Sequence, residues 1–229
     1  MGGARITVWR IDLRAAGLGP PAAPLDAGER ARAARMLDPH AARRWAWAHG
    51  AMRAILAGHL GLDPAAVAYL AGEGKPRLRP GPGIPGDLDF SLAHSGDWAW
   101  LALARGCAVG VDLEQVLPSR DGRAMAKLVC TPGESRVLAG CAGAGGNRAF
   151  HRIWVRKEAL LKAAGTGFAG PLPAHAVEAL GDGPLAGAGA GPWWLVDAPA
   201  PPGYLGALAA SVPGAAVQWR GFAGPTAPG

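Results

Sequence analysis

Cysteine is scarce in this chain of 229 residues, and long apolar runs are missing. The three cysteines, Cys107, Cys130 and Cys141, are an odd number without the spacing of metal ligands, so we expect neither a disulfide framework nor a zinc site. No uncharged apolar stretch reaches the roughly 18 residues that a membrane span requires, and the first residues lack the apolar core of a signal peptide. These absences predict a cytoplasmic protein without a membrane partner.

Acidic residues are also fewer than basic ones. The 23 Lys and Arg against 17 Asp and Glu give a net charge of +6, which predicts an anionic partner such as nucleic acid, a phosphorylated cofactor or an acidic protein. The basic residues are spread along the chain and no recognised nucleic-acid motif is present, so we expect no nucleic-acid partner. Half of the residues are hydrophobic, which is enough to form a buried core.

Periodicity predicts alternating strands and helices. The expected strands are 6–13, 90–95, 98–104, 108–114, 193–196 and 204–211, and the expected helices are 26–37, 39–60, 132–140 and 149–164. The low-complexity Gly/Ala stretch 181–192 is expected to be a loop between two late strands. The three strands between 90 and 114 are joined by short turns, which favours antiparallel pairing.

Two carboxylates in the stretch 110–114 are the first feature with chemical content. On a strand, Asp112 and Glu114 point to the same face and lie roughly 7 Å apart. Such a pair repels itself, and a hard cation that prefers oxygen ligands, Mg2+ or Mn2+, would relieve the repulsion and also hold a phosphate. Taken alone, the pair is explained more simply as two solvated acids at an exposed strand edge.

A second set lies on the expected helix 149–164. Trp154, Glu158 and Lys162 recur every four residues and therefore share one face, with Lys157 at its flank. An ordinary amphipathic helix with one Glu–Lys pair would show the same pattern. In conjunction with the pair at 112 and 114, however, a third carboxylate and two lysines suit a metal bridged to a pyrophosphate.

Two weaker signals precede these. His94 and Ser95 end an expected strand, where an imidazole and a hydroxyl could contact a phosphate, but a lone histidine is usually structural. Lys75 and Pro76 lie in a loop broken by glycines, and surface lysines next to proline are common. Each signal gains meaning only from the others.

The order of these motifs resembles the Sfp-type 4'-phosphopantetheinyl transferases. The shared blocks are GKP, F-S-x-x-H-S, VGVDLE and W-x-x-KEA-x-x-K-x-x-G-x-G, and the similar region runs from Arg30 to Phe168. The resemblance implies a holo-acyl-carrier-protein synthase, a monomer that depends on Mg2+. It would transfer the phosphopantetheine arm of coenzyme A to a serine of acyl, peptidyl or aryl carrier proteins and release 3',5'-ADP.

The resemblance also implies an α+β fold of two similar α/β halves in a pseudo-twofold arrangement, with the active site in the cleft between them. Residues 1–105 would supply the nucleotide-side contacts to coenzyme A, and residues 106–229 the metal-binding and catalytic residues. The implied metal ligands are Asp112, Glu114 and Glu158, and the implied catalytic residues are Asp112, Glu158 and Lys162. The implied contacts to coenzyme A are Arg44, Lys75, Pro76, His94, Ser95, Lys157 and Lys162, with Arg32 as a weaker candidate.

Two positions need separate attention. The family often has serine where this chain has Ala93, so a hydroxyl contact must come from Ser91, Ser95 or a backbone N–H. Glu134 matches a family glutamate that is sometimes given a metal or base role, but a capping box with Thr131 explains it equally well. The proton of the carrier serine would go to Glu158, directly or through a metal-bound water.

The segment 118–128 follows the carboxylate strand and mixes cations with apolar residues. We expect it to contact the carrier protein through Arg120, Arg123, Lys127, Met125 and Leu128. The alternative for this segment is an ordinary surface helix. The alternatives for the whole chain are a metal-dependent nucleic-acid-processing protein and a non-catalytic relative that binds coenzyme A, and the complete set of Asp112, Glu114, Glu158 and Lys162 argues against the second.

Overall fold

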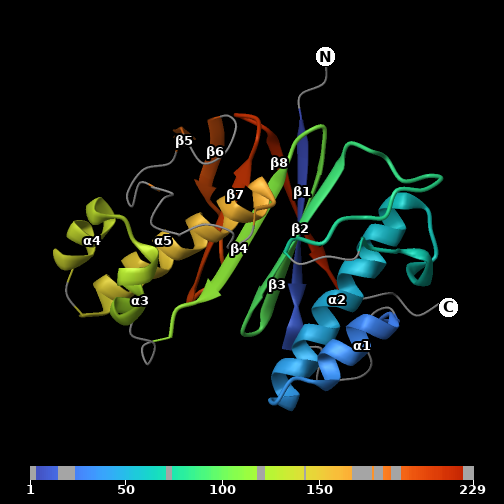
Figure 1. Cartoon of the computed structure of the whole chain (residues 1–229), viewed down its shortest axis with the longest axis horizontal. Coiled ribbons are helices and arrows are strands. Elements are labelled where there is room, and N and C mark those ends of the chain that lie inside the picture. Colours follow the sequence, from blue (N-terminus) through green and yellow to red (C-terminus); the bar gives the residue numbers. More distant parts are fainter. Residues whose placement is uncertain are drawn as a thin grey trace.

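Two four-stranded sheets and several helices form the molecule in a computed structural model, which describes residues 4–14, 24–70, 74–117, 122–141, 143–166, 177, 183–186 and 192–223 (Figure 1). The elements of the first part of the chain are β1 (Arg5–Asp12), α1 (Ala27–Ala34), α2 (Pro39–Leu60), β2 (Leu88–Ser95), β3 (Trp98–Arg105) and β4 (Val109–Gln115). Those of the second part are α3 (Gly122–Val129), α4 (Pro132–Ala139), α5 (Gly143–Ala164), β5 (Gly183–Ala186), β6 (Pro192–Asp197), β7 (Tyr204–Ala210) and β8 (Ala216–Phe222). The α+β class expected from the sequence is confirmed.

The first sheet has the strand order β2-β3-β1-β8, and the second has the order β4-β7-β6-β5. All neighbours are antiparallel except β8, which pairs in parallel with β1. The last strand of the chain therefore returns to the sheet that contains the first. The expected division between residues 105 and 106 falls in the turn that joins β3 to β4 and stays a prediction.

The helix ends follow from capping residues in the sequence. At the start of α2, the Asp38 side chain accepts a hydrogen bond from the His40 N–H, and Pro39 occupies the first turn, where its missing N–H costs nothing. The helix ends at Gly61, whose φ of 67° is a left-handed conformation that glycine adopts readily. This long helix is therefore bounded by local signals at both ends.

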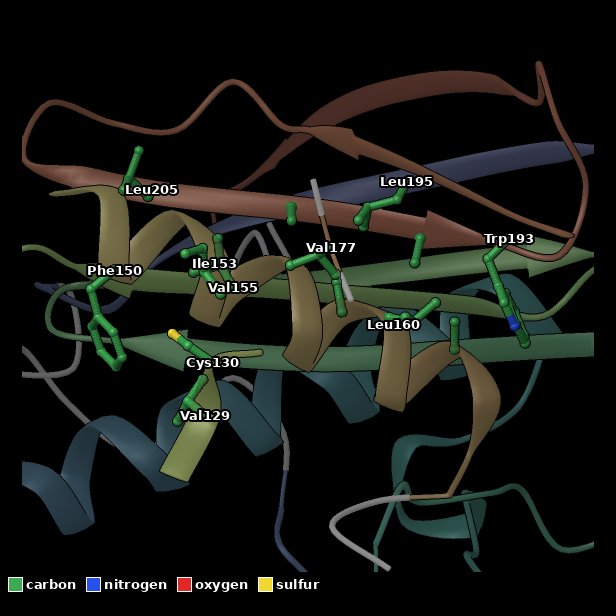
Figure 2. Packing of buried hydrophobic residues seen from close by; sticks show 14 of the residues in the cluster. Val129, Cys130, Phe150, Ile153, Val155, Leu160, Val177, Trp193, Leu195 and Leu205 are labelled. Atoms are coloured by element: carbon green, nitrogen blue, oxygen red, sulfur yellow. The ribbon is translucent and has the colours of Figure 1, made fainter. Parts of the chain in front are cut away.

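One long helix covers a face of each sheet. On α2, Met52 and Leu56 pack against Phe90 and Leu101 of the first sheet. Figure 2 shows the corresponding cluster around α5, where Ile153 and Leu160 lie against side chains of the second sheet. A third buried cluster joins β1 and β3 to β4 and β7, so the two sheets share a core as well as having one each.

Most of the expected elements are present, and the exceptions are instructive. The stretch 181–192 was expected to be a loop, but Gly183–Ala186 forms β5 because it pairs with β6. Helix α5 begins earlier than expected, at Gly143, and β8 was not expected at all. Among the described helices, none combines the length and the apolarity needed to cross a membrane.

Candidate functional site

The site lies where β4 packs against α5, and a glycine allows the close approach. A Cβ built on Gly110 would lie 1.9 Å from the carbonyl oxygen of Ala159 and 2.4 Å from the nitrogen of Ala163, both on the backbone of α5. Because side chains alternate along a strand, Asp112 points to the same side as Gly110. Val111 and Leu113 point the other way, into the core between the sheets.

Asp112 is buried and bound to α5. Its Oδ1 atom accepts a hydrogen bond of 2.7 Å from the Lys162 ammonium, and the nearby Leu113 N–H lowers the pKa of the carboxyl group. Its Oδ2 atom is buried without a hydrogen-bond partner. Burial raises the pKa of Asp112 above its ordinary value, against the opposing effect of the Lys162 charge.

Glu158 lies beside this pair, on the same helix as Lys162. Its pKa is raised to about 7, first because burial disfavours the charged form and then because the negative charges of Asp112 and Glu114 are near. Its Oε1 atom is a second buried carboxylate oxygen without a hydrogen-bond partner. A carboxyl group with this pKa can accept a proton near neutral pH.

Lys162 is the cation of the cluster. Desolvation acts against its charged form, but the carboxylates of Asp112, Glu158 and Glu114 together raise its pKa above the ordinary value. The ammonium thus stays charged through a direct hydrogen bond to Asp112 and the nearby charges of Glu158 and Glu114. The spacing of Glu158 and Lys162 along the helix, read from the sequence, does bring both to the strand that carries Asp112 and Glu114.

Glu114 is held from the opposite sheet. The Ser95 hydroxyl at the end of β2 donates a hydrogen bond of 2.7 Å to Glu114 Oε2. The same hydroxyl accepts a bond of 3.1 Å from the Gln115 N–H. Ser95, which was expected to contact a phosphate, therefore forms hydrogen bonds with two residues of β4.

The carboxylate cluster has oxygen atoms that suit a divalent cation. Among the residues that the structure describes, no three acidic, histidine or cysteine side chains converge as a complete set of metal ligands. Mg2+ is usually held by only one or two carboxylates, together with waters and substrate phosphates. The partnerless oxygens of Asp112 and Glu158 are of the kind that Mg2+ binds. The donor set therefore fits such an ion.

His94 lies near the cationic side of this cluster. Its pKa is lowered to about 4, first because neighbouring protein atoms desolvate it and then because the positive charges of His49, Lys162 and Arg32 are close. The residue is nevertheless exposed, and a shift in this direction already leaves its pKa below neutral pH. At neutral pH the imidazole is therefore uncharged, and it can donate or accept a hydrogen bond. Arg32 and His49 join this group from α1 and α2, and His49 carried no signal in the sequence.

Arg44 lies on α2, and its side chain reaches the turn between β2 and β3. Its guanidinium forms an ion pair of 2.7 Å with Asp97, and both side chains are partly exposed. The Asp97 N–H in turn donates to the hydroxyl of Tyr204 on β7. Arg44 is thus tied to a turn that contacts both sheets.

Lys75 is less accessible than expected. Its side chain is 5% exposed, and its ammonium forms an ion pair with Asp89 on β2 and donates to the Val109 carbonyl at the start of β4. Pro76 follows it, and Arg77 then lies beside a cavity of about 680 Å³ that Gly165 and Trp193 also line. Arg77 is exposed and was missed in the sequence, although it directly follows the Lys–Pro pair.

The structure does not bring Lys157 to the carboxylate cluster. Its side chain is fully buried, with the ammonium 2.7 Å from Glu134 Oε2 and 2.6 Å from the Val129 carbonyl. Glu134 forms the capping box of α4 with Thr131, and its other oxygen accepts from the Val177 N–H. Of the two readings of Glu134, these contacts favour the helix cap.

The expected carrier contact falls partly outside the described residues, which do not include 118–121. The remainder forms α3, in which Met125 is 45% and Leu128 72% exposed. Lys127, in the last turn of the helix, is exposed as well. The segment therefore presents two large apolar side chains and a cation to solvent.

The region that carries the sequence motifs is similar to known proteins. A family model described as the 4'-phosphopantetheinyl transferase superfamily matches residues 108–186, which include β4 and α5. The chain is similar to the 4'-phosphopantetheinyl transferase HetI of Nostoc sp., with 36% identity over 167 residues that cover 72% of this chain and 70% of that protein. It is also similar to the 4'-phosphopantetheinyl transferase AcpT of Salmonella typhimurium, with 33% identity over 62% of this chain and 69% of that protein. A third relative, the 4'-phosphopantetheinyl transferase of Bacillus subtilis, is 32% identical over 58% of this chain and 56% of that protein.

The matched region of the family model begins just before the strand that carries Asp112 and extends past the helix that carries Glu158 and Lys162. The similarity to the Nostoc and Salmonella proteins extends over more than two thirds of their length. The motifs noted in the sequence and these similarities have one common explanation: the chain belongs to the 4'-phosphopantetheinyl transferase superfamily.

Proposed function

We propose that this chain transfers the 4'-phosphopantetheine arm of coenzyme A to a serine hydroxyl of an apo carrier protein, in a Mg2+-dependent reaction that releases 3',5'-ADP. The enzyme class, phosphopantetheinyl transferase, follows from superfamily membership. One observation carries the rest of the proposal. Asp112 and Glu158 each keep a buried carboxylate oxygen without a partner, and both lie beside the charged Lys162.

The finer description of the fold is part of this proposal. Residues 1–105 and 106–229 would form two similar halves in a pseudo-twofold arrangement of the Sfp type, with the active site in the cleft between them. In support, each sheet is covered by a helix of 22 residues, α2 in one case and α5 in the other. Ser95 of the first sheet also bonds to Glu114 of the second. Strand β8 is an exception, since it returns to the first sheet.

The carboxylates of Asp112 and Glu158, with Glu114 beside them, would hold Mg2+ together with waters and phosphate oxygens, and the ion would neutralise charge on the pyrophosphate of coenzyme A. The carrier serine oxygen forms a bond to the β-phosphorus, and the bond from that phosphorus to the bridging oxygen breaks. The leaving 3',5'-ADP takes the bonding electron pair. Lys162 stabilises negative charge on the phosphates, and Glu158 accepts the serine proton.

The first sheet and its helices would bind the nucleotide end of coenzyme A. His94, neutral at pH 7, would donate a hydrogen bond to a phosphate oxygen, and Arg32 and Arg44 would supply positive charge. Pro76 and Arg77 would line the nucleotide side. Lys75 would act through the loop that it anchors to Asp89 and Val109, and Lys157 would have no direct contact, because it is buried against Glu134.

The enzyme would act as a monomer. Its carrier protein, an acidic partner, would dock on α3. Lys127 would attract the acidic surface of the carrier, and the exposed Met125 and Leu128 would pack against its apolar residues. Reversal of the charge at Lys127 should raise the KM for the carrier and leave the KM for coenzyme A unchanged. An unchanged KM for the carrier at low salt would move the docking site elsewhere.

The experiment that tests this function is incubation with coenzyme A, Mg2+ and a panel of apo carrier proteins, followed by intact mass measurement of each carrier. We expect at least one carrier to gain the mass of phosphopantetheine, and no gain when its acceptor serine is replaced by alanine. Asp112→Asn and Glu158→Ala should abolish the transfer, as should EDTA. Absence of a mass gain across fatty-acid, polyketide and nonribosomal-peptide carriers would contradict the proposal.

A further inference from the structure

Strands β2 and β4 lie at facing edges of the two sheets and are joined by side chains of β2. Asp89 accepts a hydrogen bond from the Val109 N–H, at 2.8 Å. Ser91 accepts from the Val111 N–H at 3.2 Å, and Ser95 accepts from the Gln115 N–H at 3.1 Å. Each acceptor lies 20 residues before its donor in the chain, so the three bonds define a single register.

This pattern solves a problem of the second sheet. Strand β4 is an edge strand, and the N–H groups of alternate residues along an edge point away from the sheet and need partners. The side chains of β2 supply those partners in place of a backbone ladder. We call the three bonds from Asp89, Ser91 and Ser95 the seam.

One position of the seam lacks a side-chain acceptor. By the same register Ala93 faces Leu113, and alanine offers no oxygen. The Leu113 N–H instead lies near the Asp112 carboxylate, where it lowers the pKa of that group. This interruption of the seam therefore lies next to the carboxylate cluster.

Ser95 differs from Asp89 and Ser91 because it contacts a carboxylate of the cluster as well. A hydroxyl has one proton to donate, and it accepts through its lone pairs. Because the Gln115 N–H occupies a lone pair of Ser95, the proton is free to point to Glu114 Oε2, at 2.7 Å. A hydrogen bond to an ionised acceptor is stronger than one between neutral groups, so this contact fixes the orientation of the Glu114 side chain.

We propose that Ser95 is a positioning residue, which holds the Glu114 carboxylate in the cluster and anchors it to the junction of the two sheets through Gln115. The proposal rests on the proposed function for the use of Glu114, and it gives Ser95 a role other than the contact with coenzyme A expected from the sequence. The seam sets where Ser95 stands relative to β4. Ser95 then sets where the Glu114 carboxylate points.

A double-mutant cycle tests the contact without metal or substrate. The equilibrium constants for unfolding of wild type, Ser95→Ala, Glu114→Ala and the double variant are measured by urea denaturation in EDTA. We expect the two substitutions to be coupled by about tenfold in the unfolding constant, the size of a hydrogen bond to a charged group. Additive effects within twofold would overturn the proposal.

Ser211→Ala is the matched control for this cycle. The Ser211 hydroxyl also accepts from a backbone amide next to β4, that of Ala108 at 2.9 Å. Because Ser211 lies at the opposite end of β4 from Glu114, its substitution should lower stability and be additive with Glu114→Ala. Coupling of similar size in this control would show that the cycle senses the general junction of the sheets, and the assignment of Ser95 would fail.

The second measurement separates positioning from contact with substrate. Mn2+ affinity is measured by electron paramagnetic resonance, and the affinity for coenzyme A is measured by calorimetry without metal. We expect Ser95→Ala to weaken Mn2+ binding by about tenfold, the usual effect of removing a group that orients a metal ligand. Ser95→Thr, which keeps the hydroxyl, should restore it, and the affinity for coenzyme A should stay unchanged.

Two other outcomes have distinct meanings. Loss of affinity for coenzyme A with unchanged Mn2+ binding would overturn the proposal, because Ser95 would then be a substrate contact. Absence of Mn2+ binding by the wild type would contradict the metal part of the proposed function, and the double-mutant cycle would then decide the role of Ser95 by itself.

Discussion

Gly110 of β4 and Ala159 of α5 are in contact through their backbones. A Cβ on Gly110 would lie 1.9 Å from the Ala159 carbonyl oxygen, a distance that real Cβ atoms do not show. This contact sets how near α5 lies to β4. It thereby sets the distance from Asp112, two residues after the glycine, to Glu158 and Lys162 on the helix.

Gly110→Ala should therefore damage both stability and activity. The added methyl group meets backbone atoms of Ala159 and Ala163, which cannot move aside without displacing the helix. We expect a loss of about 3 kcal/mol in the free energy of unfolding, measured by denaturation, and a large loss of transfer activity. The matched control is Gly58→Ala in α2, where a Cβ would meet nothing within 4 Å. That variant should gain up to about 1 kcal/mol, and equal stability of the two variants would contradict the argument.

The local patterns predicted this part of the site well. Alternation in 110–114 and the four-residue spacing of Glu158 and Lys162 define two faces, and a strand packed on a helix brings such faces together. The sequence could not show the burial of Lys157, because its partner Glu134 belongs to a different helix. Nor could it show that Ser95 bonds to Glu114 across two sheets.

Elements that form only through distant pairing were missed for a similar reason. The residues of β8 join a sheet through β1, at the other end of the chain. The short, Gly-containing β5 is a strand because β6 lies beside it. The four residues of β5 lack the local periodicity from which a strand can be predicted. Residues 217–220 of β8 do alternate between apolar and polar, so the local signal for that strand is present, and only its pairing with β1 is hidden in the sequence.

The buried ion pair between Lys157 and Glu134 should contribute to stability and not to metal binding. Glu134→Ala would leave a fully buried ammonium without its carboxylate, so we expect a loss of about 3 kcal/mol in stability. Mn2+ affinity in the folded protein should not change, because Glu134 is bound to Thr131, Val177 and Lys157. Replacement of Lys157 by methionine in the same chain should recover part of the stability.

An exposed ion pair provides the control for that variant. The pair of Asp12 and Arg14 has side chains that are 36% and 64% exposed, and Asp12→Ala should cost less than about 1 kcal/mol. Weakened Mn2+ binding in Glu134→Ala at unchanged stability would reverse our assignment and make Glu134 a metal ligand.

Substitutions of Lys75 and Arg77 should have different effects, because Lys75 anchors the loop whereas Arg77 lies beside the cavity. Lys75→Met removes a buried ammonium that ties the loop to Asp89 and Val109, so we expect a loss of about 2 kcal/mol as well as a raised KM for coenzyme A. Arg77→Ala removes an exposed cation and should raise the KM without loss of stability. Steady-state kinetics and thermal denaturation of both variants make the comparison. Equal stability of wild type and Lys75→Met would contradict the anchoring role.

The raised pKa of Glu158 predicts how stability depends on pH in the absence of metal. In the folded chain this pKa is about 7, against an ordinary value of 4.5. Between these two values the folded state binds a proton that the unfolded state has released. The contribution of protonated Glu158 to the free energy of unfolding is therefore complete below pH 4.5 and is lost as the pH rises through 7. From the size of the shift, the loss at pH 8.5 is at most about 3 kcal/mol.

Glu158→Gln replaces the titrating group by a neutral one of the same size, so its stability should not fall in this way. In EDTA, the wild type should match the variant below pH 4.5 and be the less stable of the two at pH 8.5, as measured by urea denaturation. Asp12→Asn is the control, because Arg14 lowers the pKa of Asp12 and its titration lies outside this range. Excess Mg2+ at pH 8.5 should restore the stability of the wild type and leave Glu158→Gln much less affected, since a bound cation favours the ionised carboxylate. If both proteins respond equally to Mg2+, Glu158 is not one of the metal ligands. If their pH profiles in EDTA are identical, folding does not shift the pKa of the Glu158 carboxyl group.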